Sequence, residues 1–224
     1  MSGAFGRNAG EFALLSLKQA LHGGPAPGAA PELQSVYQDI GKWITSYLMR
    51  AHPDLGRPGD VCPFTAQASR LDTIRIGVCG ATGSDAAQIT GVMRACCRQL
   101  QSIPCPATMR HFRTIVVGFP NIRDRQGLES LKAAQTQLKL HTLMRGLMIG
   151  RFYQTSDDPG LWNPDFRPLR SPIPLLAIRH LVENDAPFVI AHPMLVPTYI
   201  AKFPMAAPGR LLATLARRRA ASCR

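Results

Sequence analysis

Arg113-Thr-Ile-Val-Val-Gly-Phe119 is a continuous run of mainly apolar and β-branched residues, short enough to form one buried strand. Thr73-Ile-Arg-Ile-Gly-Val-Cys79 lies before it and has a similar β-like composition. Between the two stretches the sequence predicts a helix that ends near Gln101, for which Ser84 and Asp85 are suitable N-caps. A strand, a helix and a second strand in this order predict a sheet that carries helices.

The same alternation extends toward both ends of the chain. Helical spacing of apolar residues predicts helices over residues 11–21, 32–50 and 128–144. Short apolar runs predict strands over 147–153 and 187–191, whereas 175–181 suits either a strand or a helix. We therefore expect the α/β or α+β class, with a single sheet of about four or five strands packed with helices.

Changes in composition divide the chain into three expected segments. Residues 1–31 have the pattern of an N-terminal helix and a linker rich in glycine and proline, 32–208 of a single globular domain, and 209–224 of a basic tail. Within the domain, residues 155–174 form a long loop with five prolines. Its tryptophan and phenylalanine favour an ordered, packed loop, and long loops in compact domains are often functional.

The composition excludes several classes of protein. The 224 residues are 46% hydrophobic and 18% charged, which argues against a wholly disordered chain. No run of about 18 apolar residues occurs, so no transmembrane helix is expected. The first residues lack the pattern of a secretory signal, which favours a cytoplasmic protein.

The chain is strongly basic, with 26 lysines and arginines against 14 acidic residues and a net charge of +12. A basic surface attracts anionic partners of many kinds. Part of the charge lies in the C-terminal tail, which has no acidic residue and no nucleic-acid-binding motif. The tail arginines are Arg210, Arg217, Arg218, Arg219 and Arg224. We therefore expect a solvated tail and no nucleic-acid partner.

Six cysteines are present, and none of them forms a C-x-x-C pair. They are Cys62, Cys79, Cys96, Cys97, Cys105 and Cys223. This spacing fits neither a zinc site nor a disulfide framework, so we expect mostly reduced, buried cysteines. Cys62 is a lesser candidate for a thiolate ligand, because the proline and phenylalanine after it suggest a buried turn.

Gly77-Val-Cys-Gly80-Ala-Thr-Gly83 joins an expected strand to an expected helix. A nucleotide-binding turn would stand at this place, because backbone N–H groups at a helix start hold pyrophosphate. The spacing is G-x-x-G-x-x-G rather than G-x-G-x-x-G, and no acidic residue follows near position 103. A simple glycine turn is therefore favoured over the turn of a nucleotide-dependent reductase.

Histidines and arginines supply the other candidate site residues. His52 and His192 each precede a proline, and His180 ends an apolar run. Each can be a ligand or a hydrogen-bonded core residue, and the sequence favours the core interpretation. The three arginines near prolines and apolar residues are Arg167, Arg170 and Arg179. They suit either a clamp for a carboxylate or a lock for a loop, because guanidinium offers several donors at once.

Three stretches together resemble a known kind of domain. They are Val61-Cys-Pro-Phe64, Gly160-Leu-Trp-Asn-Pro-Asp-Phe166, and the block from Arg167 to His180 that reads RPLRSPIPLLAIRH. They are similar to an uncharacterised bacterial domain family found in specialised-metabolite gene clusters. The likeness covers about residues 45–205, and that family brings no settled activity.

The order of Cys62-Pro-Phe64, the two strands and Phe188-Val-Ile-Ala-His-Pro193 resembles the YqcI/YcgG family, which includes haem-dependent N-oxygenases. The resemblance implies that His192 is the axial metal ligand. Phe203-Pro204-Met205 stands where that family has an Asn-Pro-His segment. The implied cofactor-binding residues are His192, Arg167, Arg170, Arg179 and Lys202. The implied substrate-binding residues are Trp162, Phe166 and Tyr199.

The resemblance therefore predicts a haem-dependent, oxygenase-like protein of specialised metabolism that acts on an amine or an amino-acid-derived substrate. Its partners would be that small molecule and an electron donor, and a homodimer is compatible with the pattern. Two alternatives stay open. One is a non-catalytic module of the same fold that binds a small molecule or a carrier protein, and the other is the nucleotide-dependent reductase.

Overall fold

The computed structural model describes residues 13–23, 31–83, 86–191 and 193–222. Within this part of the chain the centre is a five-stranded sheet in the order β1-β2-β3-β5-β4. The strands are β1 Leu15–Ser16, β2 Ile74–Val78, β3 Thr114–Gly118, β4 Leu147–Phe152 and β5 Leu175–His180. Only β2 and β3 pair in parallel among these, and the other neighbours are antiparallel. The predicted mixed α/β class is confirmed.

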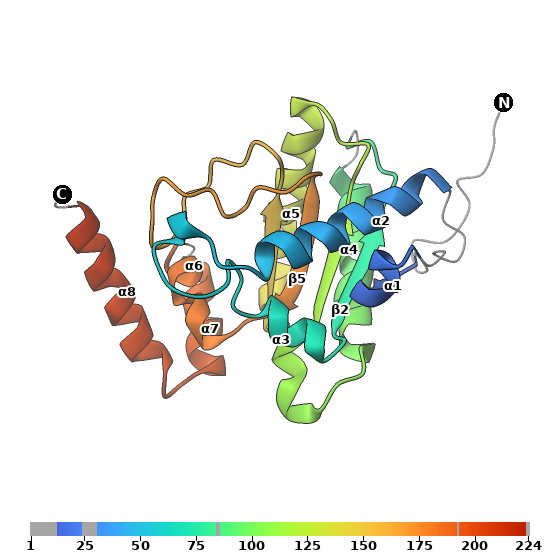
Figure 1. Cartoon of the computed structure of the whole chain (residues 1–224). Coiled ribbons are helices and arrows are strands. Elements are labelled where there is room, and N and C mark those ends of the chain that lie inside the picture. The colour runs from blue at the N-terminus through green and yellow to red at the C-terminus, as the bar shows by residue number, and fades with distance from the viewer. Residues whose placement is uncertain (1–12, 24–30, 84–85, 192, 223–224) are drawn as a thin grey trace.

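Helices cover both faces of this sheet, and a third group of helices packs at its side (Figure 1). The α-helices are α1 Leu17–Leu21, α2 Pro31–Trp43, α3 Thr65–Arg70, α4 Ala86–Gln99, α5 Arg125–Leu143, α6 Ala186–Ile190, α7 Val196–Lys202 and α8 Ala207–Ser222. The π-helix η1 Ile44–Leu48 continues α2, and the 3-10 turns are η2 Pro53–Leu55, η3 Leu100–Ser102, η4 Ala107–Phe112, η5 Glu183–Asp185 and η6 Pro193–Leu195.

The apolar run of β3 explains this layering. Ile115 and Val117 are fully buried in the core under α4 and α5. Val116 points to the other face, into the core under α1 and α2. Successive side chains of a strand alternate between faces, so a strand that is apolar throughout needs a layer on each side. Complete burial of one such side chain contributes about 1.5–3 kcal/mol.

Two expected elements take a different form. The strand predicted over 187–191 is wrong, because α6 is a helix that begins at Ala186 with Pro187 in its first turn. A five-residue apolar run is compatible with either structure, and its packing against α8 selects the helix. Residues 175–181, left open by the sequence, contain the strand β5.

At both ends of the expected domain, neighbouring segments take part in elements of the fold. In the predicted N-terminal appendage, residues 15–16 form β1 on the edge of β2, and Leu17 and Ala20 of α1 enter the core. Ser16 caps α1 through a capping box with Gln19, so this helix begins at Leu17 and not at residue 11 as the sequence predicted. At the other end, α8 begins at Ala207 and buries that residue among α6 and α7. The expected N-caps Ser84 and Asp85 lie outside the described residues.

Candidate functional site

A groove with a volume of about 780 Å³ lies where three segments meet. These are the C-terminal part of α2 with η1, the turn after His52, and the loop 155–174, which Figure 1 shows beside one another. Its lining residues are Trp43, Tyr47, His52, Asp54, Gln154, Asn163, Asp165, Phe166, Arg167, Arg170, Ser171 and Pro172. Two stretches that carry the family resemblance, residues 160–166 and the block that begins at Arg167, therefore line the groove. The end of α2 and η1 also line it, and the sequence did not predict this role for them.

Backbone contacts hold the turn and the loop together. The Asn163 side chain donates to the Asp54 carbonyl over 2.8 Å. Gly56 has a φ of +76°, and a Cβ there would lie 2.9 Å from the backbone carbon of Trp162. Only glycine tolerates both this left-handed conformation and this approach. The two segments are thus built to pack against each other.

Aromatic rings form the apolar part of the groove. The Trp43 indole N–H donates to the Arg170 carbonyl over 3.1 Å, which anchors the loop on α2. Tyr47 stacks on Trp43 with ring centroids 6.3 Å apart. The His52 ring lies on Phe166 with a centroid distance of 4.6 Å. Trp43 and Tyr47 are one helical turn apart, and the sequence showed them only as apolar positions of a helix.

The His52 ring is oriented by a hydrogen bond from the turn that follows it. Its Nδ1 accepts a hydrogen bond from the Asp54 backbone N–H over 3.2 Å. A neutral imidazole that accepts at Nδ1 carries its proton on Nε2. His52 therefore offers an N–H donor, and this arrangement suits the binding of an acceptor better than the removal of a proton from a substrate.

Tyr47 contributes a hydroxyl that stays protonated. Burial raises the pKa of Tyr47, and the positive charge of Arg170 offsets part of this effect. Among the hydrogen bonds of the described residues, none involves this hydroxyl. A half-buried hydroxyl without a partner is available to a ligand in the groove.

Arg167 and Arg170 place positive charge at the groove. Arg170 donates through Nε to the Ser156 carbonyl over 3.1 Å and reaches the exposed Asp157 carboxylate at 3.5 Å. Arg167 donates through one terminal nitrogen to the carbonyls of Pro164 and Phe166. A guanidinium has five N–H donors, so these contacts lock the loop and still leave donors for an anion. Both of the roles that the sequence left open are compatible with this geometry.

The other implied cofactor residues lie elsewhere. Arg179, at the far end of β5, binds both oxygens of the buried Asp185 at 2.8 and 2.6 Å. Burial opposes the charge of Arg179, but the hydrogen bonds and the charge of Asp185 outweigh it and raise the pKa of Arg179. The Lys202 ammonium donates to the carbonyls of Gly146 and Leu181. Neither cation is therefore directed at the groove.

The other residues that the resemblance implied also lie in two different places. The Tyr199 hydroxyl donates to the Glu183 carbonyl and the ring is fully buried with α6 and α8. Phe166 is buried against His52, whereas the Trp162 side chain is half exposed. His192 lies outside the described residues. The implied residues that the structure describes thus form two separate sets, one on the loop 155–174 and one around Asp185 and α7.

Two other features of the sequence, the glycine turn and the cysteines, have a structural account. Gly83 has a φ of +80° and packs on the backbone of Gly127, which suits a simple glycine turn. Burial raises the pKa of Cys97 to about 11, and it also raises the pKa of Cys96.

In the described ranges, no cluster of three or more His, Cys, Asp or Glu residues could hold a metal ion. None of the helices searched there is long and apolar enough to cross a membrane.

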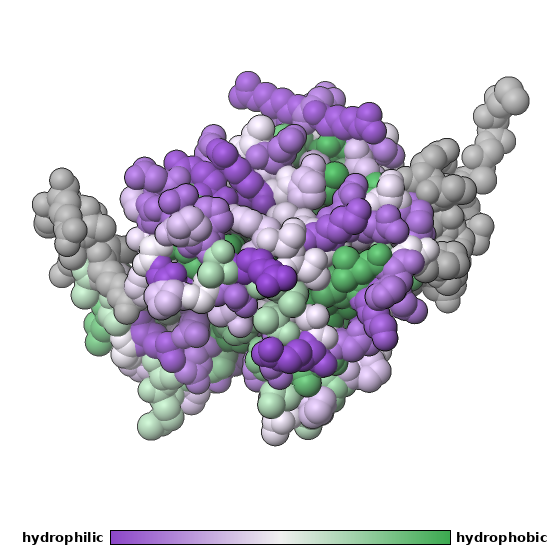
Figure 2. All heavy atoms as spheres, viewed as in Figure 1, coloured by the Kyte–Doolittle hydropathy of each residue, from purple (hydrophilic) through white to green (hydrophobic). Residues whose placement is uncertain are grey.

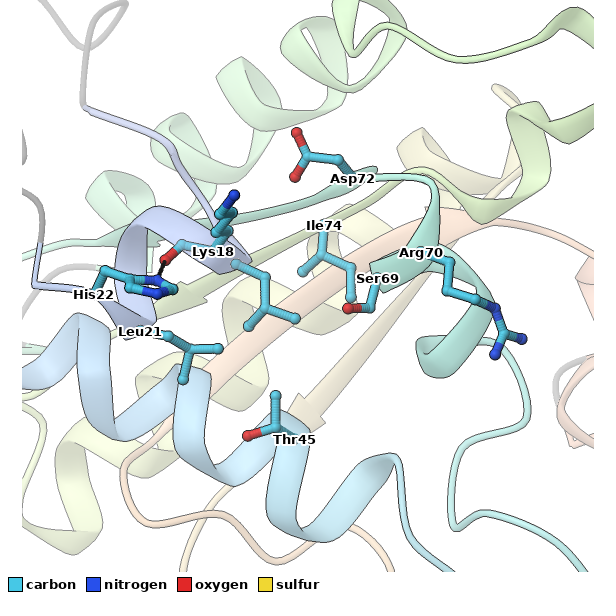
Figure 3. A pocket seen from close by; sticks show the side chains of 9 residues that line it. Lys18, Leu21, His22, Thr45, Ser69, Arg70, Asp72 and Ile74 are labelled. Carbon is cyan, nitrogen blue, oxygen red and sulfur yellow. Dashed lines mark hydrogen bonds between the residues drawn. The ribbon is translucent and has the colours of Figure 1, made fainter.

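A second hollow of about 400 Å³ lies between α1, η1, α3 and the start of β2. Figure 2 shows hydrophobic surface between α1, α2 and β2, and Leu17, Leu21 and Ile74 supply apolar lining to the hollow. Figure 3 shows the His22 ring turned to the Lys18 carbonyl, which its Nδ1 contacts at 2.8 Å. This hollow has fewer polar side chains along its lining than the larger groove has, so the larger groove is the better candidate site.

His180, at the end of β5, is a partly buried histidine whose Nε2 atom is completely buried. Burial lowers its pKa to about 4, together with the positive charges of Lys202, Arg113, His111 and Arg110. In the unfolded chain a histidine titrates near pH 6.5, so below that pH the unfolded state binds more protons than the folded state. This contribution to stability is complete above about pH 6.5 and is lost as the pH falls toward 4.

We therefore expect the His180→Gln variant to lose less stability than the wild type between pH 7 and pH 4.5. Urea unfolding at several pH values would measure the two slopes. Carboxylates also titrate in this range, but they are common to both proteins and cancel in the difference. Identical slopes in the two proteins would contradict the assignment.

The fold and the groove together define a single-sheet α/β domain with an aromatic and arginine-lined surface site. Residues 37–213 match the family model DUF6875, a domain of unknown function, and the chain belongs to that family. No curated protein and no solved structure is significantly similar to it. The predicted membership of an uncharacterised domain family is confirmed, while the gene-cluster context and the likeness to YqcI/YcgG stay predictions.

Proposed function

We propose that this domain binds an amino-acid-derived small molecule in the groove between η1 and the loop 155–174. The observation that carries this proposal is the convergence of Arg167, Arg170 and the Tyr47 hydroxyl on a surface built from aromatic rings. A carboxylate would accept hydrogen bonds from the guanidinium groups, and a planar side chain would pack on Tyr47 and Phe166.

The charges of the groove favour a zwitterion over a simple anion. Asp54 and Asp165 line the same groove as the two arginines. A ligand with a carboxylate and an ammonium group can satisfy both signs at once, whereas a dianion would meet repulsion from the two aspartates. This pattern supports an amino acid or a close derivative as the ligand class.

Binding is proposed without a chemical step. The His52 tautomer supplies a donor, and the groove residues include no nucleophile paired with a base. Haem-dependent oxygenation stays a prediction of the family resemblance. Arg179 is paired with Asp185 and Lys202 donates to backbone carbonyls, so neither of them joins Arg167 and Arg170 at the groove.

Calorimetric titration with L-tryptophan, L-phenylalanine and L-tyrosine, and with the corresponding amides, tests the proposal. We expect the free acids to bind and Arg170→Met to weaken binding about 10–100-fold, because a hydrogen bond to a charged group contributes about 1.5–3 kcal/mol. Tyr47→Phe should weaken binding several-fold and leave the melting temperature unchanged, because this hydroxyl has no partner among the described residues.

Arg123→Met is the matched control, since Arg123 is an exposed arginine outside the groove. It should bind the same acids as the wild type does. Equal affinity of acids and amides, or no binding of any compound in the panel, would remove the proposed function.

A further inference from the structure

Arg113 does not line the groove, and it is buried with no hydrogen-bond partner among the described residues. It is only 8% exposed, and its Nε atom is completely buried with no hydrogen-bond acceptor. Across the described ranges, its side chain makes no hydrogen bond and no ion pair. A buried N–H donor without an acceptor is unfavourable, and native proteins rarely keep one unless an ion or water satisfies it.

The sheet places His180 directly beside this arginine. Thr114 pairs with Arg179 in the antiparallel register of β3 and β5, so the preceding Arg113 stands opposite His180. Arg113 has an extended backbone that continues β3. Residues two apart in a strand share a face, so both side chains follow Ile115 and Ile178 toward the α4 and α5 side.

His180 has an orphan atom of its own. Its Nε2 is buried and has no hydrogen-bond partner within the described part of the chain. Two unsatisfied nitrogen atoms on neighbouring strands therefore share one face at one end of the sheet. This is a pair of potential donors with no acceptor between them.

The charges around this pair have one sign. Arg113, Arg110 and His111 come from η4 and the residue after it, and Lys202 comes from α7. These are the charged groups that act on His180, and no carboxylate occurs among them.

The acid that acts on Lys202 is already paired with another residue. Asp185 acts on Lys202, but both of its oxygens are held by Arg179. Lys202 spends two of its three N–H donors on the carbonyls of Gly146 and Leu181.

We propose that Arg113 and His180, with Arg110, His111 and Lys202 around them, form a binding site for an oxyanion of the phosphate type. A phosphate oxygen between the two side chains, on this face of the sheet, would accept from Arg113 Nε and from His180 Nε2, satisfying both orphan atoms. The ligand is either inorganic phosphate or the phosphate group of a small metabolite. This site is independent of the groove proposed above.

Thermal unfolding of the whole chain, in phosphate or glycerol 3-phosphate at constant ionic strength, tests the site. Saturable stabilisation by inorganic phosphate identifies the free ion, and tighter binding of the ester identifies a phosphorylated metabolite. Arg113→Met should weaken the response at least tenfold. In buffer without phosphate, the same variant should melt no lower than the wild type, because it removes a buried donor that has no acceptor among the described residues.

Arg151→Met is the matched control, because Arg151 is also a largely buried arginine but has Asp158 at 4.0 Å. It should respond to phosphate as the wild type does. Equal stabilisation of wild type and Arg113→Met would indicate a general salt effect and overturn the proposal, as would a lack of any response.

Nuclear magnetic resonance of His180 in the wild type gives a second readout that does not depend on the folding of a variant. Saturating phosphate should raise the histidine pKa from about 4, because a bound anion favours the imidazolium. Chloride at equal ionic strength should not. An unchanged His180 titration in phosphate would contradict the site even if Arg113→Met fails to fold.

Discussion

Asp185→Ala should destabilise the domain by about 2–4 kcal/mol, because it leaves the largely buried guanidinium of Arg179 without its counter-charge. Asp185 is 2% exposed and accepts two hydrogen bonds from Arg179. Its Oδ2 also accepts from the Val182 backbone N–H over 2.9 Å, which holds the turn that leads into α6. The substitution removes all three bonds at once. Urea unfolding of the purified variant would measure the loss.

Two further variants separate the pair from its surroundings. Glu183→Ala breaks the exposed pair with Arg210 and should cost less than about 1 kcal/mol. The double variant Arg179→Met with Asp185→Leu should recover much of the loss, because it leaves no unpaired charge in the interior. A cost for Asp185→Ala no larger than that of Glu183→Ala would show that the buried pair does not stabilise the fold.

Gly83→Ala should destabilise the domain by about 2–5 kcal/mol, from the combined cost of a left-handed alanine and of a steric overlap. The φ of Gly83 is +80°, and a Cβ would lie 2.7 Å from the Gly127 Cα and 3.1 Å from Ile122 Cγ1. Gly127 belongs to the first turn of α5, where its N–H donates to the capping Asp124. Backbone on both sides of the contact prevents an easy adjustment.

Gly91→Ala should have the opposite effect and stabilise the protein by roughly 0.5–1 kcal/mol, because it adds a methyl group inside a helix. Gly91 lies within α4, and a Cβ there meets no atom within 4 Å. Denaturant unfolding of the two variants in parallel would check both signs. A Gly83→Ala protein as stable as the wild type would mean that packing does not explain this glycine.

The sequence predicted the elements that carry a long or one-sided apolar pattern. The sequence predicted β2, β3 and the helix α5 at about their observed positions. Elements that pack in or on a sheet need apolar residues at a regular spacing, and this spacing is visible in the sequence. β1 and α6 are too short to show a regular spacing of apolar residues. β1 has two residues and exists only because β2 offers an edge, and α6 depends on its contact with α8.

The sequence predicted some residues of the groove and missed others. His52, Arg167 and Arg170 were candidates from the sequence, and the structure places them in one groove. The contribution of Trp43 and Tyr47 was not foreseen, since an aromatic residue at helical spacing usually packs in a core. The partners of Lys202 are backbone carbonyls, one of them 56 residues away, and residue type alone does not reveal such a partner.

β1 covers the outer edge of β2, yet it lies before residue 37, where the family match begins. An uncovered strand edge is a template on which another chain can add a strand. The boundaries of the recognised domain thus leave out the segment that closes the sheet on this side. A fragment cut to those boundaries would carry an open edge of Ile74–Val78 and would be prone to self-association through it.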